Sequence, residues 1–458
     1  MNGRADNTVD GMGRPEQNAS MRRSKAIGRG CHDPFMKKAS QARLAWVLFI
    51  LIGSTWPWMA AGKDLLVTDF GALGDGRKVD TRPIQAALDA AGESGGGVVR
   101  IPAGTYLTGS LMMRSHVCLH LDEGATLTGT ANAADYPLVT ARWEGVDAPC
   151  HRALIWGDKV EDVSVEGAGV IIGNAAMGAL RSPRGVPVVE FLHGHGIRVE
   201  GLTLQSTHMW TLHPEFCEDV TVKAVRFQTI GSNSDGIDPD SCHHVLIDGC
   251  IFSTGDDNIA IKSGKGVEGR RAGIPSEDIV ITHCRFIKGY TSVALGSELS
   301  GGIRNVWIGD CEFGEGHAAL ELKSRAGRGG YAEQVWMTNV VVEREPLLEI
   351  TANYSFNPDP QGIEGAEGYT RFRGIQVEGA RVEGPYLMRI DGASKSVAEG
   401  VTLRNVTGQC RQSSRLSNVR GLNLEGVRVR VKSGPDYLTN NVEGNGIQNA
   451  APLDRMRR

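Results

Sequence analysis

A short hydrophobic pattern returns along most of the chain from about Val117. Each unit reads apolar-x-apolar-x-x-apolar or small-x-apolar, as in the residues that begin at Val163, Ile197 and Val220. The same frame returns at Val245, Ile279, Val306, Val335, Ile375, Val401 and Leu422. The starts lie about twenty to forty residues apart, which is typical of a solenoid with loops inserted between its strands.

The alternation within each unit predicts strands that turn one face inward, and the Gly or Asn in the middle indicates a bend. No helical pattern alternates with these strands, which argues against a βαβ barrel. A single coil cannot bury its inner face, so successive coils must stack on each other. The pattern therefore predicts an all-β fold, a single-stranded right-handed parallel β-helix.

The two ends of the repeat region differ from it. Residues 80–91 have an early proline, Pro83, and apolar positions at helical spacing, with Asp80 or Thr81 as the expected cap. We expect a short N-terminal capping helix here that covers otherwise unpaired strand edges. The periodicity fades after about Val431, so residues 63–435 are predicted to form the β-helix and residues 436–458 a loose tail.

Residues 1–62 read as an N-terminal extension. An apolar stretch runs from Leu44 to Ala61 and follows the basic residues of Met36-Lys37-Lys38. Counted from Met36, the segment has the three regions of a signal peptide. An uncleaved membrane anchor is the alternative, because the stretch approaches spanning length. Both interpretations predict an exported protein, either periplasmic or secreted.

The composition limits the classes of binding partner that can be expected. The net charge of the 458 residues is only −4, which gives no reason to expect nucleic acid or an anionic membrane, and 41% apolar residues suffice for a core. The nine cysteines contain no CxxC pair. Cys250, Cys284 and Cys311 recur at equivalent places in their units, which favours a buried row of thiols over disulfides.

Three carboxylates gather in the middle of the repeats. Asp235 lies in Asn-Ser-Asp-Gly, and Asp256 and Asp257 follow in Gly-Asp-Asp one unit later. Neighbouring strands of a stacked coil lie about 4.8 Å apart, so these groups are expected on one wall. Crowding raises the pKa of at least one acid, and an acid with a base is what glycoside hydrolysis requires. The alternative is that they are solvated turn residues.

At these residues the chain resembles glycoside hydrolase family 28, the polygalacturonases and their relatives. The resemblance rests on separated blocks that include Asp69–Ala72, Trp143–Gly145, Trp210–Pro214, Asn233–Ser241, Thr254–Gly264, Gly296–Val306 and Lys323–Gly330. It implies a parallel β-helix that hydrolyses pectin with inversion and needs no cofactor. It also implies that Asp256 is the general acid and that Asp235 and Asp257 position and deprotonate water.

Two positions depart from the family pattern. Where the family has Gly-His-Gly, this chain has Gly289-Tyr290-Thr291, and the later His317 lies in the following coil. The family's Arg-Ile-Lys reads Glu321-Leu322-Lys323. The resemblance implies that Lys323, Tyr290 and Glu321 meet the substrate. Since a like charge disfavours an anionic sugar, we expect either altered specificity, for a neutral residue such as rhamnose or a modified uronide, or weakened catalysis.

Other candidates carry less weight. Trp210 and His213 either line a sugar subsite or pack, and Arg270-Arg271 either meets a uronate or is a solvated loop. His193 and His195 have no third ligand at a usual spacing, so no metal is predicted.

The expected partner is a plant cell-wall polysaccharide or oligosaccharide, bound by a monomer. The insertions 136–152 and 344–369 would make the enzyme end-cutting if they close one side of the groove. The rival functions are a polysaccharide lyase on a similar solenoid and a non-catalytic carbohydrate-binding β-helix.

Overall fold

The computed structural model describes residues 63–356 and 361–453, which all belong to one compact unit, Pro57–Arg458. The predicted signal peptide or anchor in residues 1–62 lies outside the described residues. Within the described ranges, no helix is both long and apolar enough to cross a membrane.

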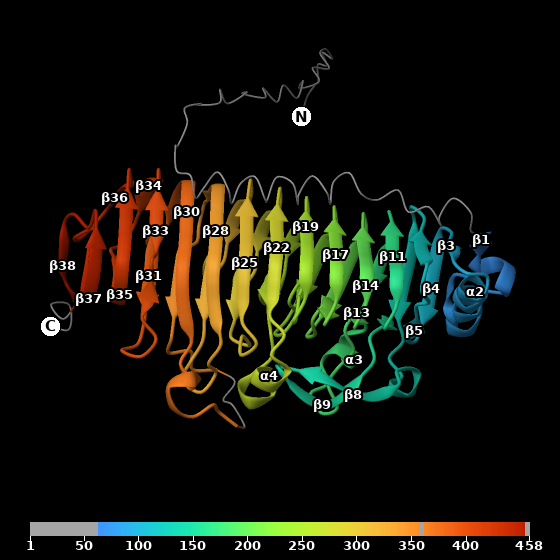
Figure 1. The fold of residues 1–458 in the computed structure, drawn as a ribbon. Coiled ribbons are helices and arrows are strands. Elements are labelled where there is room, and N and C mark those ends of the chain that lie inside the picture. The colour runs from blue at the N-terminus through green and yellow to red at the C-terminus, as the bar shows by residue number, and fades with distance from the viewer. Residues whose placement is uncertain (1–62, 357–360, 454–458) are drawn as a thin grey trace, which may run out of the picture. The chain divides into compact units, whose positions relative to one another are not determined.

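The described chain winds into a stack of parallel coils (Figure 1), and a typical coil contributes one strand to each of three sheets. One coil is formed by β13 (Val189–Leu192), β14 (His195–Glu200) and β15 (Thr203–Thr207). We call the sheet that contains β13 the site sheet, that of β14 the second sheet and that of β15 the third sheet. The predicted all-β parallel coil is confirmed.

The three sheets have the following members. The site sheet contains β5 (Leu111–Met112), β10 (Ile155–Asp158), β13, β16 (Leu212–Glu215), β21 (Ile259–Ile261), β24 (Val293–Gly296), β27 (Leu320–Lys323), β29 (Leu348–Thr351) and β31 (Met388–Asp391). The second sheet contains β1 (Lys63–Leu66), β3 (Gly97–Ile101), β6 (Val117–Leu121), β11 (Glu161–Gly167), β14, β17 (Glu218–Lys223), β19 (His243–Asp248), β22 (Ser276–Thr282), β25 (Ile303–Gly309), β32 (Ala398–Glu399) and β33 (Thr402–Arg404). The third sheet contains β2 (Asp75–Val79), β4 (Gly104–Thr108), β7 (Ala125–Gly129), β12 (Val170–Ile172), β15, β18 (Arg226–Ile230), β20 (Ile251–Ser253), β23 (Arg285–Lys288), β26 (Glu312–Glu315), β34 (Thr407–Cys410) and β36 (Arg428–Val431). Long strands β28 (Tyr331–Val342), β30 (Arg371–Gly384) and β35 (Ser414–Glu425) continue from one sheet into the next.

The core consists of ladders of identical or similar side chains that face into the coil. The repeat starts Val163, Ile197, Val220, Val245 and Ile279 pair directly along the second sheet, as the sequence predicts. In the third sheet Phe227, Phe252, Phe286 and Phe313 stack with ring centroids 4.7, 5.1 and 4.8 Å apart. Each coil thus buries its apolar face only against its neighbours.

All eight cysteines of the described residues are buried free thiols. Cys250, Cys284 and Cys311 occupy the corner between the second and third sheets in successive coils, where each thiol donates to a backbone carbonyl. The predicted row of structural thiols is confirmed.

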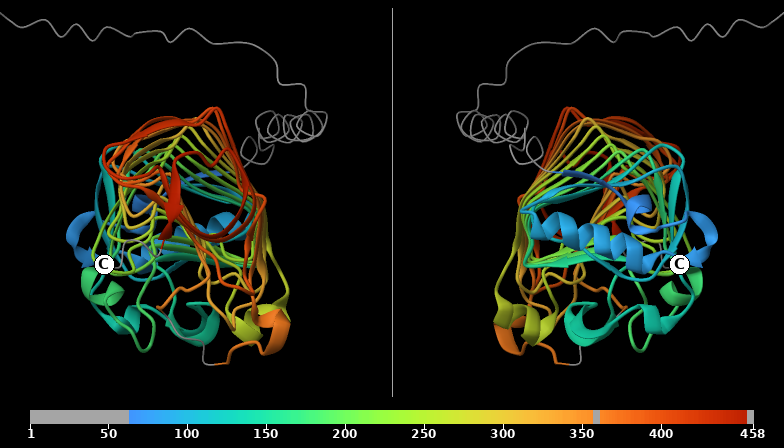
Figure 2. Two further views of the ribbon diagram at one scale, coloured as in Figure 1. Left: turned by 90° about the vertical axis from the view of Figure 1, so that its left-hand side faces the viewer. Right: turned by 90° about the vertical axis from the view of Figure 1, so that its right-hand side faces the viewer.

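Helix α2 (Thr81–Glu93) lies across the N-terminal end of the stack of coils (Figure 2). Its buried face, formed by Ile84, Ala87, Leu88 and Ala91, packs into the core. Asp80 is the N-cap residue, one of the two that the sequence predicts, but its side chain makes no capping hydrogen bond. Its carboxylate instead accepts the backbone N–H groups of Leu73 and Gly74, both at 3.0 Å, and so fastens the preceding loop.

The loose tail that the sequence predicts from residue 436 does not begin there. Strand β37 (Tyr437–Asn445) pairs in parallel with β35, and β38 (Ala450–Pro452) pairs with β37. The apolar pattern fades in this segment because most of its side chains are exposed on the last coils. Backbone pairing, rather than side-chain burial, therefore continues the stack.

Three insertions meet beside the site sheet. The hairpin of β8 (Leu138–Trp143) and β9 (Val146–His151) contacts helix α4 (Gly266–Ala272), since Gly145 accepts the N–H of Lys265 and Glu268 accepts that of Asp147. Helix α4 in turn meets the third insertion, in which Glu367 pairs with Arg270 at 3.1 Å. Figure 1 shows α4, β8, β9 and the short helix α3 (Ala175–Gly178) gathered on one side of the coils.

Candidate active site

The three predicted aspartates come together at the turns that lead into the site sheet. Asp235 precedes the segment in which Ile237 bridges Leu212 and Ile259, and Asp256 and Asp257 precede β21 in the next coil. Asp256 accepts the N–H of Asn233 at 2.8 Å and that of Asp257 at 3.0 Å. The equal register of the two coils brings the carboxylates together, as the sequence predicts.

The aspartates line a groove of about 290 Å³ whose walls come from the coils and from two of the insertions. The hairpin β8–β9 contributes Glu144, and the segment after β29 contributes Tyr354 and Phe356. The lining residues are Glu144, Trp210, Asn233, Asp235, Asp256, Asp257, Lys262, Tyr290, Gly296, Ser297, Glu298, Lys323, Tyr354 and Phe356.

Asp257 is held by two donors. Lys323 Nζ donates to Asp257 Oδ2 at 2.8 Å, and the backbone N–H of Thr291 donates to Oδ1 at 3.0 Å. Both side chains of the ion pair are buried, at 6 and 7% exposure, so the contact is charge-assisted and poorly screened. Burial alone would lower the pKa of Lys323, but Asp257 and Glu321 outweigh it and raise that pKa.

A second buried lysine faces the other side of the cluster. Lys262 Nζ lies 3.3 Å from Asp238, 3.5 Å from Glu298 and 3.8 Å from Asp235. It also lies 4.6 Å from the centre of the Trp210 ring. Burial alone would lower the pKa of Lys262, but the charges of Glu298, Asp238 and Asp235 raise it, so this residue stays cationic.

Two of the three aspartates hold protons more strongly than usual. Burial, together with the charges of Asp238 and Asp256, raises the pKa of Asp235 well above its ordinary value. Burial and the charge of Asp257 likewise raise the pKa of Asp256. These groups titrate as a set, and the set retains a proton at a pH at which an isolated aspartate has lost it.

Tyr290 and His317 stack in successive coils, with ring centroids 5.2 Å apart and planes 7° from parallel. Tyr290 lines the groove, as expected, and 47% of it is exposed. His317 belongs to the next coil, yet its ring lies against the residue that replaces the family histidine.

Glu321 is not among the residues that line the groove, in contrast to the sequence expectation. It is 4% exposed, and Thr291 Oγ1 donates to its carboxylate at 2.8 Å. The same carboxylate lies 3.4 Å from Lys323 Nζ and 3.7 Å from His317 Nε2. The negative charge of Glu321 is therefore compensated by two neighbours, Lys323 and the titratable His317.

Trp210 and His213 have different roles. Trp210 lines the groove, and the centre of its ring lies 4.8 Å from that of Trp143. His213, in contrast, is fully buried beneath Trp210. His213 Nδ1 lies 3.3 Å from Glu190, which also accepts from Arg184 at 2.8 Å. Arg270, the other uncertain candidate, pairs with Glu367 and is not among the groove residues.

Several groove residues had no role assigned from sequence. Lys262 and Glu298 lie inside sequence blocks that carry the family resemblance. The resemblance could therefore have identified them as site residues, although no role was assigned to them. Glu144 also lies in such a block, Trp143–Gly145, whereas Tyr354 comes from an insertion outside them, and no repeat places insertions in three dimensions.

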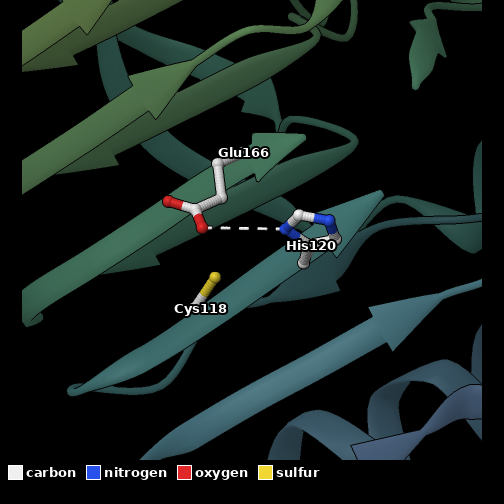
Figure 3. Close-up of side chains that lie close together, drawn as sticks. All are labelled: Cys118, His120 and Glu166. Atoms are coloured by element: carbon white, nitrogen blue, oxygen red, sulfur yellow. Dashed lines mark ion pairs between the residues drawn. The ribbon is translucent and has the colours of Figure 1, made fainter. Parts of the chain in front are cut away.

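One group of three potential metal ligands occurs in the described ranges, outside the groove: Cys118 and His120 on β6 with Glu166 on β11 (Figure 3). His120 Nδ1 lies 3.6 Å from Glu166. Burial raises the pKa of the Cys118 thiol to about 12, so the thiolate that would bind a metal is disfavoured. His193 and His195, the pair considered from sequence, face separate aspartates, Asp158 at 3.1 Å and Asp219 at 3.2 Å.

The groove offers proton donors and acceptors side by side, with two lysines that can meet an anionic ligand. Carboxyl groups on a shared wall can protonate a leaving oxygen and activate water. The geometry therefore suits acid–base hydrolysis of an acidic sugar chain.

Comparison with known proteins agrees with this chemistry. A probable polygalacturonase of Vitis vinifera is 29% identical over 365 residues, which are 74% of this chain and 73% of that protein. The structure of a hyperthermoactive exopolygalacturonase from Thermotoga maritima matches with a TM-score of 0.74 and 27% identity, covering 80% of this chain and 92% of that one. A family 28 exopolygalacturonase of Yersinia enterocolitica shares the fold, with a TM-score of 0.73, 20% identity and coverage of 85 and 79%. The family model for glycosyl hydrolases family 28 matches residues 97–433, and the chain therefore belongs to that family.

Proposed function

We propose that this enzyme hydrolyses galacturonate-containing pectic chains with inversion of configuration. The observation that carries the proposal is the cluster of Asp235, Asp256 and Asp257 in one groove together with Lys262 and Lys323. Either lysine can pair with a sugar carboxylate, and the relatives include a probable polygalacturonase and an exopolygalacturonase. The buried position of Glu321 supports galacturonate as a substrate in spite of the altered family motif.

In the proposed mechanism Asp256 protonates the leaving glycosidic oxygen. Its raised pKa keeps the proton available, and it is less buried than Asp235 or Asp257. Asp235 and Asp257 hold the attacking water on the opposite side of the sugar, and Asp257, whose carboxylate accepts a hydrogen bond from Lys323, takes its proton. For inversion the acid and base carboxyls must leave room for this water. Lys323 orients Asp257 and can contact a sugar carboxylate at the same time.

We further propose end-cutting. The linked insertions, in which Gly145 meets Lys265 and Arg270 meets Glu367, form a wall on one side of the groove and support cleavage near a chain end.

The signal-peptide pattern of residues 36–62 supports export of the protein. The packing of helix α2 supports a cap at the N-terminal end of the coil, whose right hand is proposed from the family resemblance, and the enzyme is expected to act as a monomer.

The substrate proposal is tested by reducing-end release from polygalacturonate, rhamnogalacturonan and their oligosaccharides, using protein that lacks residues 1–62. Polygalacturonate should be cleaved fastest, and the viscosity should fall slowly relative to the number of new reducing ends because cuts occur at chain ends. Preference for rhamnogalacturonan would show that the Glu321 and Tyr290 substitutions have changed specificity. Release from none of these substrates would instead favour a carbohydrate-binding β-helix.

A further inference from the structure

A second cleft, of about 270 Å³, lies on the later coils of the same face as the active-site groove. Its walls include Tyr386, Arg389, Gln412 and Arg415. Arg389 is on β31 and Arg415 on β35, two strands that continue the site sheet beyond β27 and β29. No carboxylate is among the lining residues of this cleft.

The two arginines are direct partners across adjacent strands. Like charges in this position repel each other. Arg389 has partial compensation, because Glu349 lies 3.7 Å away and the guanidinium lies 4.7 Å from the centre of the Tyr386 ring. The side chain of Arg415 is exposed and has no hydrogen bond or ion pair within residues 63–356 and 361–453. An anion bound between the two arginines would relieve the repulsion.

Contacts connect this cleft with the active-site groove. Tyr290, at the groove, stacks on His317, and His317 Nε2 lies 3.4 Å from Glu349. Glu349 accepts a hydrogen bond from the Tyr386 hydroxyl and so reaches the wall of the second cleft. Arg389 and Arg415 lie two and three strands beyond that of Lys323, or about 10 and 14 Å along the stack.

We propose that Arg389 and Arg415 form a distal subsite that binds the carboxylate of an acidic sugar a few residues away from the bond being cleaved. This inference rests on the proposed function, because it assumes an acidic polymer in the groove. An arginine fork matches a carboxylate in a bidentate manner, and the neighbouring Tyr386 ring offers a surface for the sugar. The subsite makes the enzyme prefer long acidic chains over short ones.

Arg415→Gln tests the subsite, with Arg430→Gln as the matched control. Arg430 is exposed on β36 in the third sheet, so this control removes the same charge away from the cleft. The ratio of KM for hexagalacturonate to KM for digalacturonate should rise about tenfold in Arg415→Gln, the loss expected for one hydrogen bond to a charged group. Arg430→Gln should keep the wild-type ratio, and neither variant should have a lower melting temperature than the wild type.

Binding is measured separately from turnover, by calorimetry with hexagalacturonate on Asp256→Asn and on Asp256→Asn/Arg415→Gln. A tenfold weaker affinity of the double variant supports the subsite even if wild-type protein shows no hydrolysis, in which case only the proposed function fails. Normal hydrolysis with an unchanged KM ratio and unchanged affinity overturns the subsite and leaves the function standing. Absence of both hydrolysis and binding overturns both.

Discussion

Asp256→Asn should reduce kcat on polygalacturonate by a factor of about 10²–10⁴, the usual contribution of a general acid. The asparagine has similar size and can still accept one of the two backbone N–H groups, from Asn233 or Asp257, that now reach the carboxylate. It cannot protonate the leaving oxygen. Initial rates of reducing-end release at saturating substrate measure the effect.

Asp310→Asn is the control for this variant. Asp310 is exposed, lies after β25 far from the groove, and has a φ of +53°, a conformation that asparagine tolerates well. The control should match the wild-type rate. A sugar carrying a more acidic leaving group should recover part of the activity of Asp256→Asn, since it needs less protonation. Retention of the wild-type rate by Asp256→Asn would show that another group is the acid.

Arg184→Met should lower the free energy of unfolding by about 3–5 kcal/mol, as expected when one partner of a buried ion pair is removed. Arg184 and Glu190 are both fully buried, and their contact at 2.8 Å lies directly beneath the wall that carries Trp210 and His213. The variant leaves the Glu190 charge without its main partner. Urea unfolding at neutral pH measures the change.

The double variant Arg184→Met/Glu190→Gln should lose less stability than the single variant, because it leaves no unpaired charge. Burial alone would raise the pKa of Glu190, but Arg184 and His213 lower it to about 2. A lowered carboxyl pKa stabilises the folded state above the unfolded value, near 4.5, and this contribution disappears as the pH falls through about 2. The loss of unfolding free energy in Arg184→Met, relative to the wild type, should therefore become smaller as the pH falls. A loss of about 1 kcal/mol or less at neutral pH, as for an exposed pair, would contradict this account.

The fold was predictable because its information is local and repeated. The alternation around Val163, Ile197 and Val220 specifies one inward face per strand, and only stacking can bury such faces. The same reasoning failed at Tyr437–Asn445, where backbone pairing continues after the apolar pattern has ended. The sequence predicted Asp80 as a possible N-cap residue but not that its carboxylate binds a loop and not the helix.

The site was predictable for those residues whose positions follow from the register between successive coils. Asp235, Asp256 and Asp257 meet because successive coils are aligned, and Lys323 reaches Asp257 from two strands further on. The burial of Glu321 was not predictable, because it depends on contacts with Thr291 and His317. The walls built by Glu144 and Tyr354 come from insertions that have no periodicity.

The most direct test of the central claim is the anomeric configuration of the first product, followed by proton NMR during hydrolysis of an oligogalacturonate. The account requires a water held by Asp235 and Asp257 to attack opposite the bond protonated by Asp256. The first product should therefore appear with the configuration opposite to that of the cleaved bond, before mutarotation mixes the anomers. A first product with retained configuration would mean that a carboxylate attacks the sugar directly, and it would contradict the assignment of these residues.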